Sequence, residues 1–167
     1  GYTALGALEE GDQNTVIGSY AGNAITDGDD NTILGYDAGG AITTANNNTA
    51  IGSGALDTLT VGNDNVAVGK DTLTSISLGE HSNVAIGTLA MRGMNEGTGG
   101  GDIDRNIAIG YDALRGGNLG SNDRQITRNI AIGVYALDAT ADNAQTGTIA
   151  IGDEALTALT SGAKNTA

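Results

Sequence analysis

Short apolar runs that each end in a glycine recur along the whole chain of 167 residues. Most runs read Asn, then three small or β-branched residues, then Gly, as in residues 14–18 (NTVIG), 48–52 (NTAIG) and 106–110 (NIAIG). Successive glycines are separated by 17, 17, 17, 17, 18, 23, 23 and 19 residues, measured between Gly1, Gly18, Gly35, Gly52, Gly69, Gly87, Gly110, Gly133 and Gly152. Such a regular period predicts a repeat architecture in which every repeat forms the same structural unit.

A second apolar segment follows each of these glycines. Ala stands three residues after the glycine in eight of the nine repeats, with Thr72 as the exception. An aliphatic residue often stands seven residues after it, and Gly, Asn and Asp separate the apolar segments. Each repeat therefore predicts two short strands joined by turns. No helix is expected, because β-branched residues dominate and a 17-residue repeat leaves no room for a strand plus a stable helix.

A parallel β-solenoid of the β-roll type suits this repeat, since each coil then lies on the previous one with strands about 4.8 Å apart. We expect an all-β rod of about nine coils, with 17–23 residues per coil and a length of roughly 40 Å. Residues 1–167 form one repeat domain, with enlarged coils at 87–132. We expect this domain to be a segment of a longer fibre, because its last residues start another motif.

Stacking of equivalent positions places the Asn at the start of each motif in one row. A side-chain amide both donates and accepts hydrogen bonds, so such a row can form a ladder between coils. We assign this structural role to Asn14, Asn31, Asn48, Asn65, Asn83, Asn106, Asn129 and Asn165. Only the repeat that ends at residues 148–152 (TIAIG) lacks the Asn.

The motif strand carries no charge on either face. Residues one and three before the glycine are medium or large, whereas the residue two before it is usually small. A strand without a polar face needs cover on both sides. The inside of the coil supplies one cover, and we expect identical chains to supply the other, with the small face allowing their close approach. A homotrimeric rod is the economical assembly; a broad monomeric solenoid is the alternative.

Composition and charge narrow the function classes. The chain has 28 Gly but no Phe, Trp, Cys or Pro, which disfavours a conventional globular core and, through the absence of Cys, excludes disulfides and thiolate metal sites. The one histidine, His81, has no second His or nucleophile nearby, and we interpret it as a surface residue. A net charge of −13 disfavours nucleic acid as a partner. No apolar run is long enough for membrane insertion.

Acidic and amide residues repeat in the turn before each Asn. Carboxylates stacked about 4.8 Å apart repel one another unless they are hydrated, neutralised or mixed with amides. Oxygen ligands suit calcium, and Asp29, Asp30 and Asp64 are its candidate ligands. The nonapeptide of calcium-binding β-rolls is absent, so a solvated acidic edge is the favoured interpretation and we expect no cofactor.

The two 23-residue repeats carry insertions at residues 94–105 and 116–128, at equivalent points of adjacent coils. Insertions in repeat proteins map to loops on one face and often bind a partner, although drift at tolerant corners is the alternative. All five Tyr follow a repeat glycine by one or two residues and line one edge, where they either pack on the coil below or stack on a sugar ring. Candidate receptor-binding residues, for a cell-surface glycan, are Arg105, Arg115, Arg124, Arg128 and Tyr111.

The motif N-T-A-I-G-x-x-A-L, nearly intact at residues 48–56 and present as NIAIGYDAL at 106–114, resembles the repeats of phage tail fibres. Many such fibres end in an intramolecular chaperone of the endosialidase type. The motif is also similar to the shorter repeat in the head of YadA-like trimeric autotransporter adhesins, which are left-handed parallel β-rolls. The resemblance covers the whole chain and implies a trimeric, fibrous attachment protein.

We therefore expect a structural or attachment protein, namely a repeat segment of a fibrous appendage that mediates host or surface attachment. Its expected location is extracellular, on a virion tail or a cell surface. An extracellular filament or matrix fibre without receptor binding is the alternative. A carbohydrate-active solenoid enzyme would need paired carboxylates in a groove, so we expect no enzyme. An ice-binding solenoid would need an unbroken Thr row, which ends after Thr49.

Overall fold

The computed structural model describes residues 1–74, 79–94, 102–116, 125–138, 145–159 and 162–167. Eight three-residue strands form one parallel sheet in the order β1-β2-β3-β4-β5-β6-β8-β10. They are β1 Thr15–Ile17, β2 Thr32–Leu34, β3 Thr49–Ile51, β4 Val66–Val68, β5 Val84–Ile86, β6 Ile107–Ile109, β8 Ile130–Ile132 and β10 Ile149–Ile151. We call this the main sheet.

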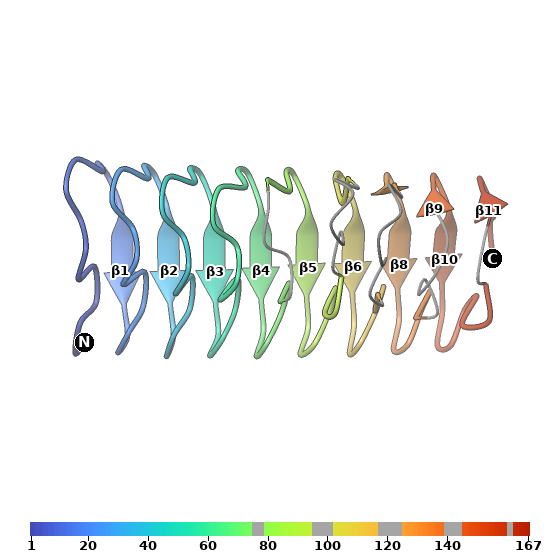
Figure 1. Cartoon of the computed structure of the whole chain (residues 1–167). Coiled ribbons are helices and arrows are strands. Elements are labelled where there is room, and N and C mark those ends of the chain that lie inside the picture. Colours follow the sequence, from blue (N-terminus) through green and yellow to red (C-terminus); the bar gives the residue numbers. More distant parts are fainter. Residues whose placement is uncertain (75–78, 95–101, 117–124, 139–144, 160–161) are drawn as a thin grey trace.

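Equivalent residues of successive repeats pair in strict register along the main sheet. Thr15 pairs with Thr32, and Ala108 pairs with Ala131. Figure 1 shows the strands side by side, with the chain advancing by one strand at each turn. The predicted all-β parallel solenoid is confirmed, with about seven turns from β1 to β10.

The prediction of two strands per repeat is wrong for the first coils. The Ala–Leu segment after each glycine forms turns instead, with left-handed backbone two and four residues after the glycine, as at Asp71 (φ 50°) and Leu73 (φ 54°). Among the described residues, a second strand appears only in the C-terminal coils, just before the Asn position or its Thr148 equivalent. These strands are β7 Ile126–Thr127, β9 Gln145–Thr146 and β11 Gly162–Ala163, and they pair in parallel as a small second sheet.

The repeat glycines are required by close coil stacking. Gly52 has φ 133°, and a Cβ there would collide with the backbone carbonyl of Gly69 on the next coil. Each glycine meets its successor in the same way along the row up to Gly133. The repeat glycine thus fixes the distance between coils at the corner that follows the strand.

The middle residue of each strand points into the coil. It is fully buried from β2 to β10, as Ile33 and then as Ala50, Ala67, Ala85, Ala108, Ala131 and Ala150. The expectation that the small face would meet a neighbouring chain is therefore wrong. Successive strand residues point to opposite sides, so the larger residues on either side of the Ala face outward.

Core volume is conserved between coils although the residues change. In the coil of β2 the large Ile33 packs against Gly39, where an added Cβ would lie 2.8 Å from the Ile33 Cδ1 atom. In the next coil the equivalent positions hold Ala50 and Leu56, both fully buried. Gly39 (φ 57°) and Leu56 (φ 54°) share the same backbone conformation. The exchange of a large residue between two facing positions keeps the core filled.

This exchange predicts a rescue. We expect Ile33→Ala to destabilise the rod by about 2–4 kcal/mol through a cavity, and Gly39→Leu to cost about 1–3 kcal/mol through overpacking. The double variant should return to within about 1.5 kcal/mol of the parent, since it copies the next coil. Urea unfolding followed by circular dichroism measures all three. Additive losses in the double variant would contradict the volume argument.

Candidate functional site

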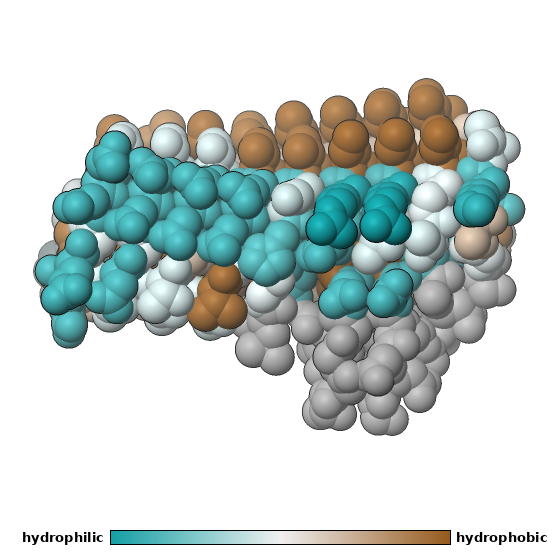
Figure 2. All heavy atoms as spheres, turned by 90° about the horizontal axis from the view of Figure 1, so that it is seen from above, coloured by the Kyte–Doolittle hydropathy of each residue, from teal (hydrophilic) through white to brown (hydrophobic). Residues whose placement is uncertain are grey.

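The outer face of the main sheet is an uncharged array of two rows. One row holds the residues three before each repeat glycine: Thr15, Thr32, Thr49, Val66, Val84, Ile107, Ile130 and Ile149. The other holds the residues just before it: Ile17, Leu34, Ile51, Val68, Ile86, Ile109, Ile132 and Ile151. Ile17 and Ile151, at the two ends, are 59% and 58% exposed. Figure 2 shows both rows as a largely hydrophobic band beside a hydrophilic stripe.

A contiguous apolar band along a folded chain marks an interaction surface rather than ordinary scatter of apolar residues. The band follows from strand geometry, because the inward Ala leaves Ile, Val or Thr on both sides of it. The outer face is therefore the candidate functional site, and the two corners that flank it are its borders.

The Asn row forms a hydrogen-bonded ladder inside the corner before the strands. From Asn14 to Asn106, each Oδ1 accepts the backbone N–H of the next Asn at 3.0 Å and its Nδ2–H at 3.0–3.2 Å. Each Nδ2 also donates to a backbone carbonyl of the following coil at 2.6–3.0 Å. These buried amides are fully satisfied, so the ladder locks coil to coil.

The ladder ends where the sequence lacks an Asn. The Thr148 backbone N–H still donates to Asn129 Oδ1 at 3.0 Å, but the buried Thr148 hydroxyl has no hydrogen-bond partner. Asn165 lies beyond this break and accepts a bond from Ile149 through its backbone carbonyl.

A second ladder runs along the strand-start corner, which we define as the residues five and six before each repeat glycine. The backbone N–H of Asp12 donates to Asp29 Oδ1 at 2.7 Å, and the same link repeats from Asp29 to Asn46 and from Asn46 to Asn63. The Asn63 N–H then donates to His81 Nδ1 at 3.1 Å, and the His81 N–H donates to Asp104 Oδ1 at 2.8 Å. His81 is thus not a plain surface residue, because it replaces an amide in this ladder.

Exposed charge on the strand-start corner changes sign along the rod. Residues five before the glycine include the exposed Asp30 and Asp64 in the first half and the exposed Arg105 and Arg128 in the second. The exposed Lys164 stands at the equivalent place, directly before Asn165. One carboxylate oxygen of Asp29 accepts a hydrogen bond of the second ladder, from the Asp12 N–H. Within the described ranges, no group of three or more acidic or His side chains could hold a metal ion. Neither the favoured interpretation, a solvated acidic edge, nor its alternative, calcium at Asp29, Asp30 and Asp64, is tested by this arrangement.

The tyrosines lie on the opposite border, the strand-end corner, which we define as the residues one and two after each repeat glycine. Tyr2, Tyr20 and Tyr36 stack edge to face with ring centroids 5.7 and 5.8 Å apart. Tyr111 and Tyr135 stack in the same way at 5.5 Å. Four of the five rings stay exposed, with Tyr135 half-buried, so packing and access to a ligand coexist in this row.

The candidate receptor residues do not form one cluster in a single chain. Arg105 and Arg128 lie on the strand-start corner, whereas Tyr111 lies on the strand-end corner. Arg115 belongs to a separate row of ion pairs, described next. Arg124 and much of both insertions lie outside the described residues.

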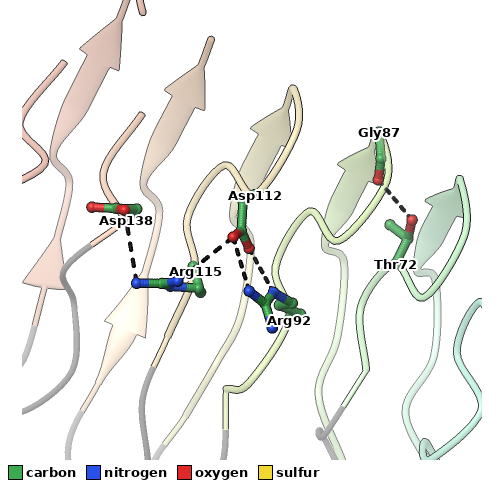
Figure 3. Close-up of polar contacts among 6 residues, drawn as sticks. All are labelled: Thr72, Gly87, Arg92, Asp112, Arg115 and Asp138. Atoms are coloured by element: carbon green, nitrogen blue, oxygen red, sulfur yellow. Dashed lines mark hydrogen bonds and ion pairs between the residues drawn. The ribbon is translucent and has the colours of Figure 1, made fainter. Parts of the chain in front are cut away.

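Figure 3 shows this row of ion pairs along the turns after the strands. The buried carboxylate of Asp112 accepts hydrogen bonds from Arg92 Nε at 2.7 Å and Nη2 at 3.0 Å, and its Oδ2 lies 3.6 Å from Arg115 Nη1. Arg115 reaches on to Asp138 at 3.9 Å. The hydrogen bonds to Asp112 raise the pKa of Arg92. Thr72, the exception in the Ala row, donates its hydroxyl to the Gly87 carbonyl at 2.8 Å.

Two other acidic side chains, Asp57 and Glu80, have buried carboxylate oxygens without a hydrogen-bond partner. Burial raises the pKa of Asp57, and the nearby carboxylates of Asp37 and Asp71 raise it further. Glu80 is 1% exposed, and both of its carboxylate oxygens lack a hydrogen-bond partner. Equivalent positions in the next two coils hold the buried Ile103 and Ile126, so Glu80 occupies an aliphatic position.

Comparison of the chain with protein-family models, with curated proteins and with solved structures yields no match in any of the three. Within the described ranges, no helix has the length and apolarity to cross a membrane.

The break in the Asn ladder predicts a stabilising substitution. We expect Thr148→Asn to raise the unfolding free energy by about 1 kcal/mol, because it supplies the missing amide between Asn129 and Asn165. Thr157→Asn is the matched control, since it introduces the same side chain away from the row. Thermal or urea unfolding measures the effect, and an unchanged midpoint for Thr148→Asn would contradict it.

Proposed function

We propose that the chain is a non-enzymatic structural and attachment protein, a repeat segment of a fibrous appendage on a virion tail or a cell surface. The observation that carries this proposal is the uncharged outer face, which runs along all eight strands of the main sheet. A rod with such a face is built to pack laterally. Packing against copies of itself would cover this face and convert a thin solenoid into a stiffer fibre.

A homotrimer suits the dimensions of this face. Each strand has three residues and so presents only two outward side chains per coil. Three narrow faces around one axis enclose a triangular core in which every outward side chain is covered. The hydrophilic corners beside the face would then remain at the fibre surface or at the junctions between chains.

The exposed arginines on the strand-start corner support a role in attachment. Arg105 and Arg128 lie exposed on adjacent coils, next to the apolar band. Guanidinium groups bind carboxylates by paired hydrogen bonds, which suits an acidic cell-surface glycan. The alternative, a filament without receptor binding, would use the same outer face for assembly, and these arginines would then bind no glycan.

The assembly is tested by mass and by one outward substitution. We expect sedimentation equilibrium to return three times the chain mass of 16.6 kDa. Ile132→Asp should weaken association by about 100-fold or more, because three unpaired charges would meet at the axis. Val61→Asp is the matched control, an acid in place of a 42% exposed aliphatic residue away from the main sheet. A folded monomer in the parent chain would contradict the proposal.

Attachment is tested with the trimer and carboxylated glycans. We expect the double variant Arg105→Ser with Arg128→Ser to lose at least about tenfold in glycan affinity, because it removes both paired contacts. Lys70→Ser removes an exposed cation from the other corner and serves as the control. Sedimentation of each variant confirms that the trimer persists. Unchanged binding in the double variant would favour the filament without receptor binding.

A further inference from the structure

One link of the second ladder differs from the others in its chemistry. The backbone N–H of Asn63 donates to His81 Nδ1 at 3.1 Å, whereas the other links described along this corner end on a carboxylate or amide oxygen. An amide oxygen does not titrate, and a carboxyl group keeps an accepting oxygen even when it is protonated. Imidazole accepts only in its neutral form, because both nitrogens become donors when the ring gains a proton. The link through His81 is therefore the described one whose acceptor a proton removes.

This link joins the coil of His81 to the shorter coils before it. A second bond lies beside it on the same corner, since the Ser82 N–H donates to the Asn63 carbonyl at 3.0 Å. On the other side, His81 is joined to the next coil through its backbone alone. Its N–H donates to Asp104 Oδ1 at 2.8 Å, and its carbonyl accepts from the Arg105 N–H at 3.1 Å. Protonation of the ring thus removes a bond on the Asn63 side only.

The charged side chains on the neighbouring coils do not prevent protonation of this ring. On this corner Asp64 lies in the coil below His81 and Asp104 in the coil above, and a carboxylate attracts an imidazolium. Arg105 follows Asp104 and repels it. Glu80 precedes His81, but its side chain is 1% exposed and occupies the core row that continues in Ile103. Two acids and one base on the corner leave proton uptake favourable within about pH 5 to 8, the range in which imidazole changes charge.

We infer that His81 is a pH-sensitive link between coils, formed while its imidazole is neutral and lost when the ring is protonated. Protonation sets two donors against each other, the ring N–H and the Asn63 N–H. The link is therefore present near pH 8 and lost as the pH falls toward about 5. The amides of Asn65 and Asn83 do not titrate and still bond the same two coils, so the opening is local and reversible. This inference depends neither on self-association nor on glycan binding.

The first test is the protonation state of the ring nitrogens, measured by nitrogen NMR on the full chain in its native assembly. Near pH 8 we expect the tautomer with its hydrogen on Nε2, because Nδ1 must accept the Asn63 N–H. The ring signals need no assignment, since the chain has one His. A hydrogen on Nδ1 at this pH would overturn the inference.

The second test is hydrogen exchange of the Asn63 amide, expressed as its protection relative to an unfolded chain at the same pH. From about pH 8 to about pH 5 we expect this protection to fall at least about fivefold, as for one lost hydrogen bond. The Asn46 amide is the internal control, because its acceptor is the Asn63 side-chain oxygen at 2.8 Å. Its protection should stay within about twofold, since that amide oxygen does not titrate.

Two variants separate His81 from the buried acid beside it. His81→Asn copies the amide links of the neighbouring coils and should make the protection of Asn63 independent of pH. Glu80→Gln should leave the pH dependence of the parent in place. A dependence that persists in His81→Asn would overturn the inference, and one lost in Glu80→Gln would assign the effect to the buried carboxyl instead. Equal protection of the parent Asn63 amide at both pH values would also overturn it.

Discussion

Superposition of each coil on the previous one is the constraint on which the structure depends. Two rows enforce it from opposite ends of the strand. The glycine row allows a backbone approach that no Cβ would tolerate, and the Asn ladder closes only when the amides lie one coil apart. Because both rows join the same atoms from the coil of Asn14 to the coil of Asn129, a coil in this stretch that changed shape would break contacts on both sides. Insertions are therefore confined to places that leave these rows intact, as the 23-residue repeats show.

The same constraint overrides local conformational preference. Leu, Met, Tyr and Arg residues adopt left-handed backbone at fixed places in the coil, for example Leu114 (φ 52°) and Arg128 (φ 59°). Each such residue costs roughly 1 kcal/mol in isolation. This conformational free-energy cost is offset because hydrogen bonds between coils pair the backbone groups of the turn. For example, the Leu114 N–H donates to the Ala136 carbonyl at 2.8 Å. Stability in this rod belongs to the stack and not to the single coil.

The repeat pattern alone predicts the parallel stack, the absence of helix and the row of Asn residues, because each depends on position within the period. It does not predict which strand face is inside, since neither face carries charge. That choice follows from volume, as the pairing of Ile33 with Gly39 and of Ala50 with Leu56 shows. Nor does it predict turns in place of the second strand, because non-glycine residues rarely adopt positive φ. The ladder role of His81 was missed, although aligning the repeats places it in one row with Asn63 and Asp104. The pairing of Arg92 with Asp112 was also missed, because the two residues stand at different positions of the repeat.

Narrow strands have a consequence for where specificity can lie. With three residues per strand, the middle one fills the core and the outer two form the uncharged outer face, so neither side of the strand carries a charged residue. Charge is left to the corners, where side chains project without disturbing the glycine and Asn rows. This explains how the exposed position five before the glycine can change from Asp30 and Asp64 to Arg105 and Arg128 while the coil stays the same. In such a rod the stack determines the shape, and the corners determine what each coil can contact.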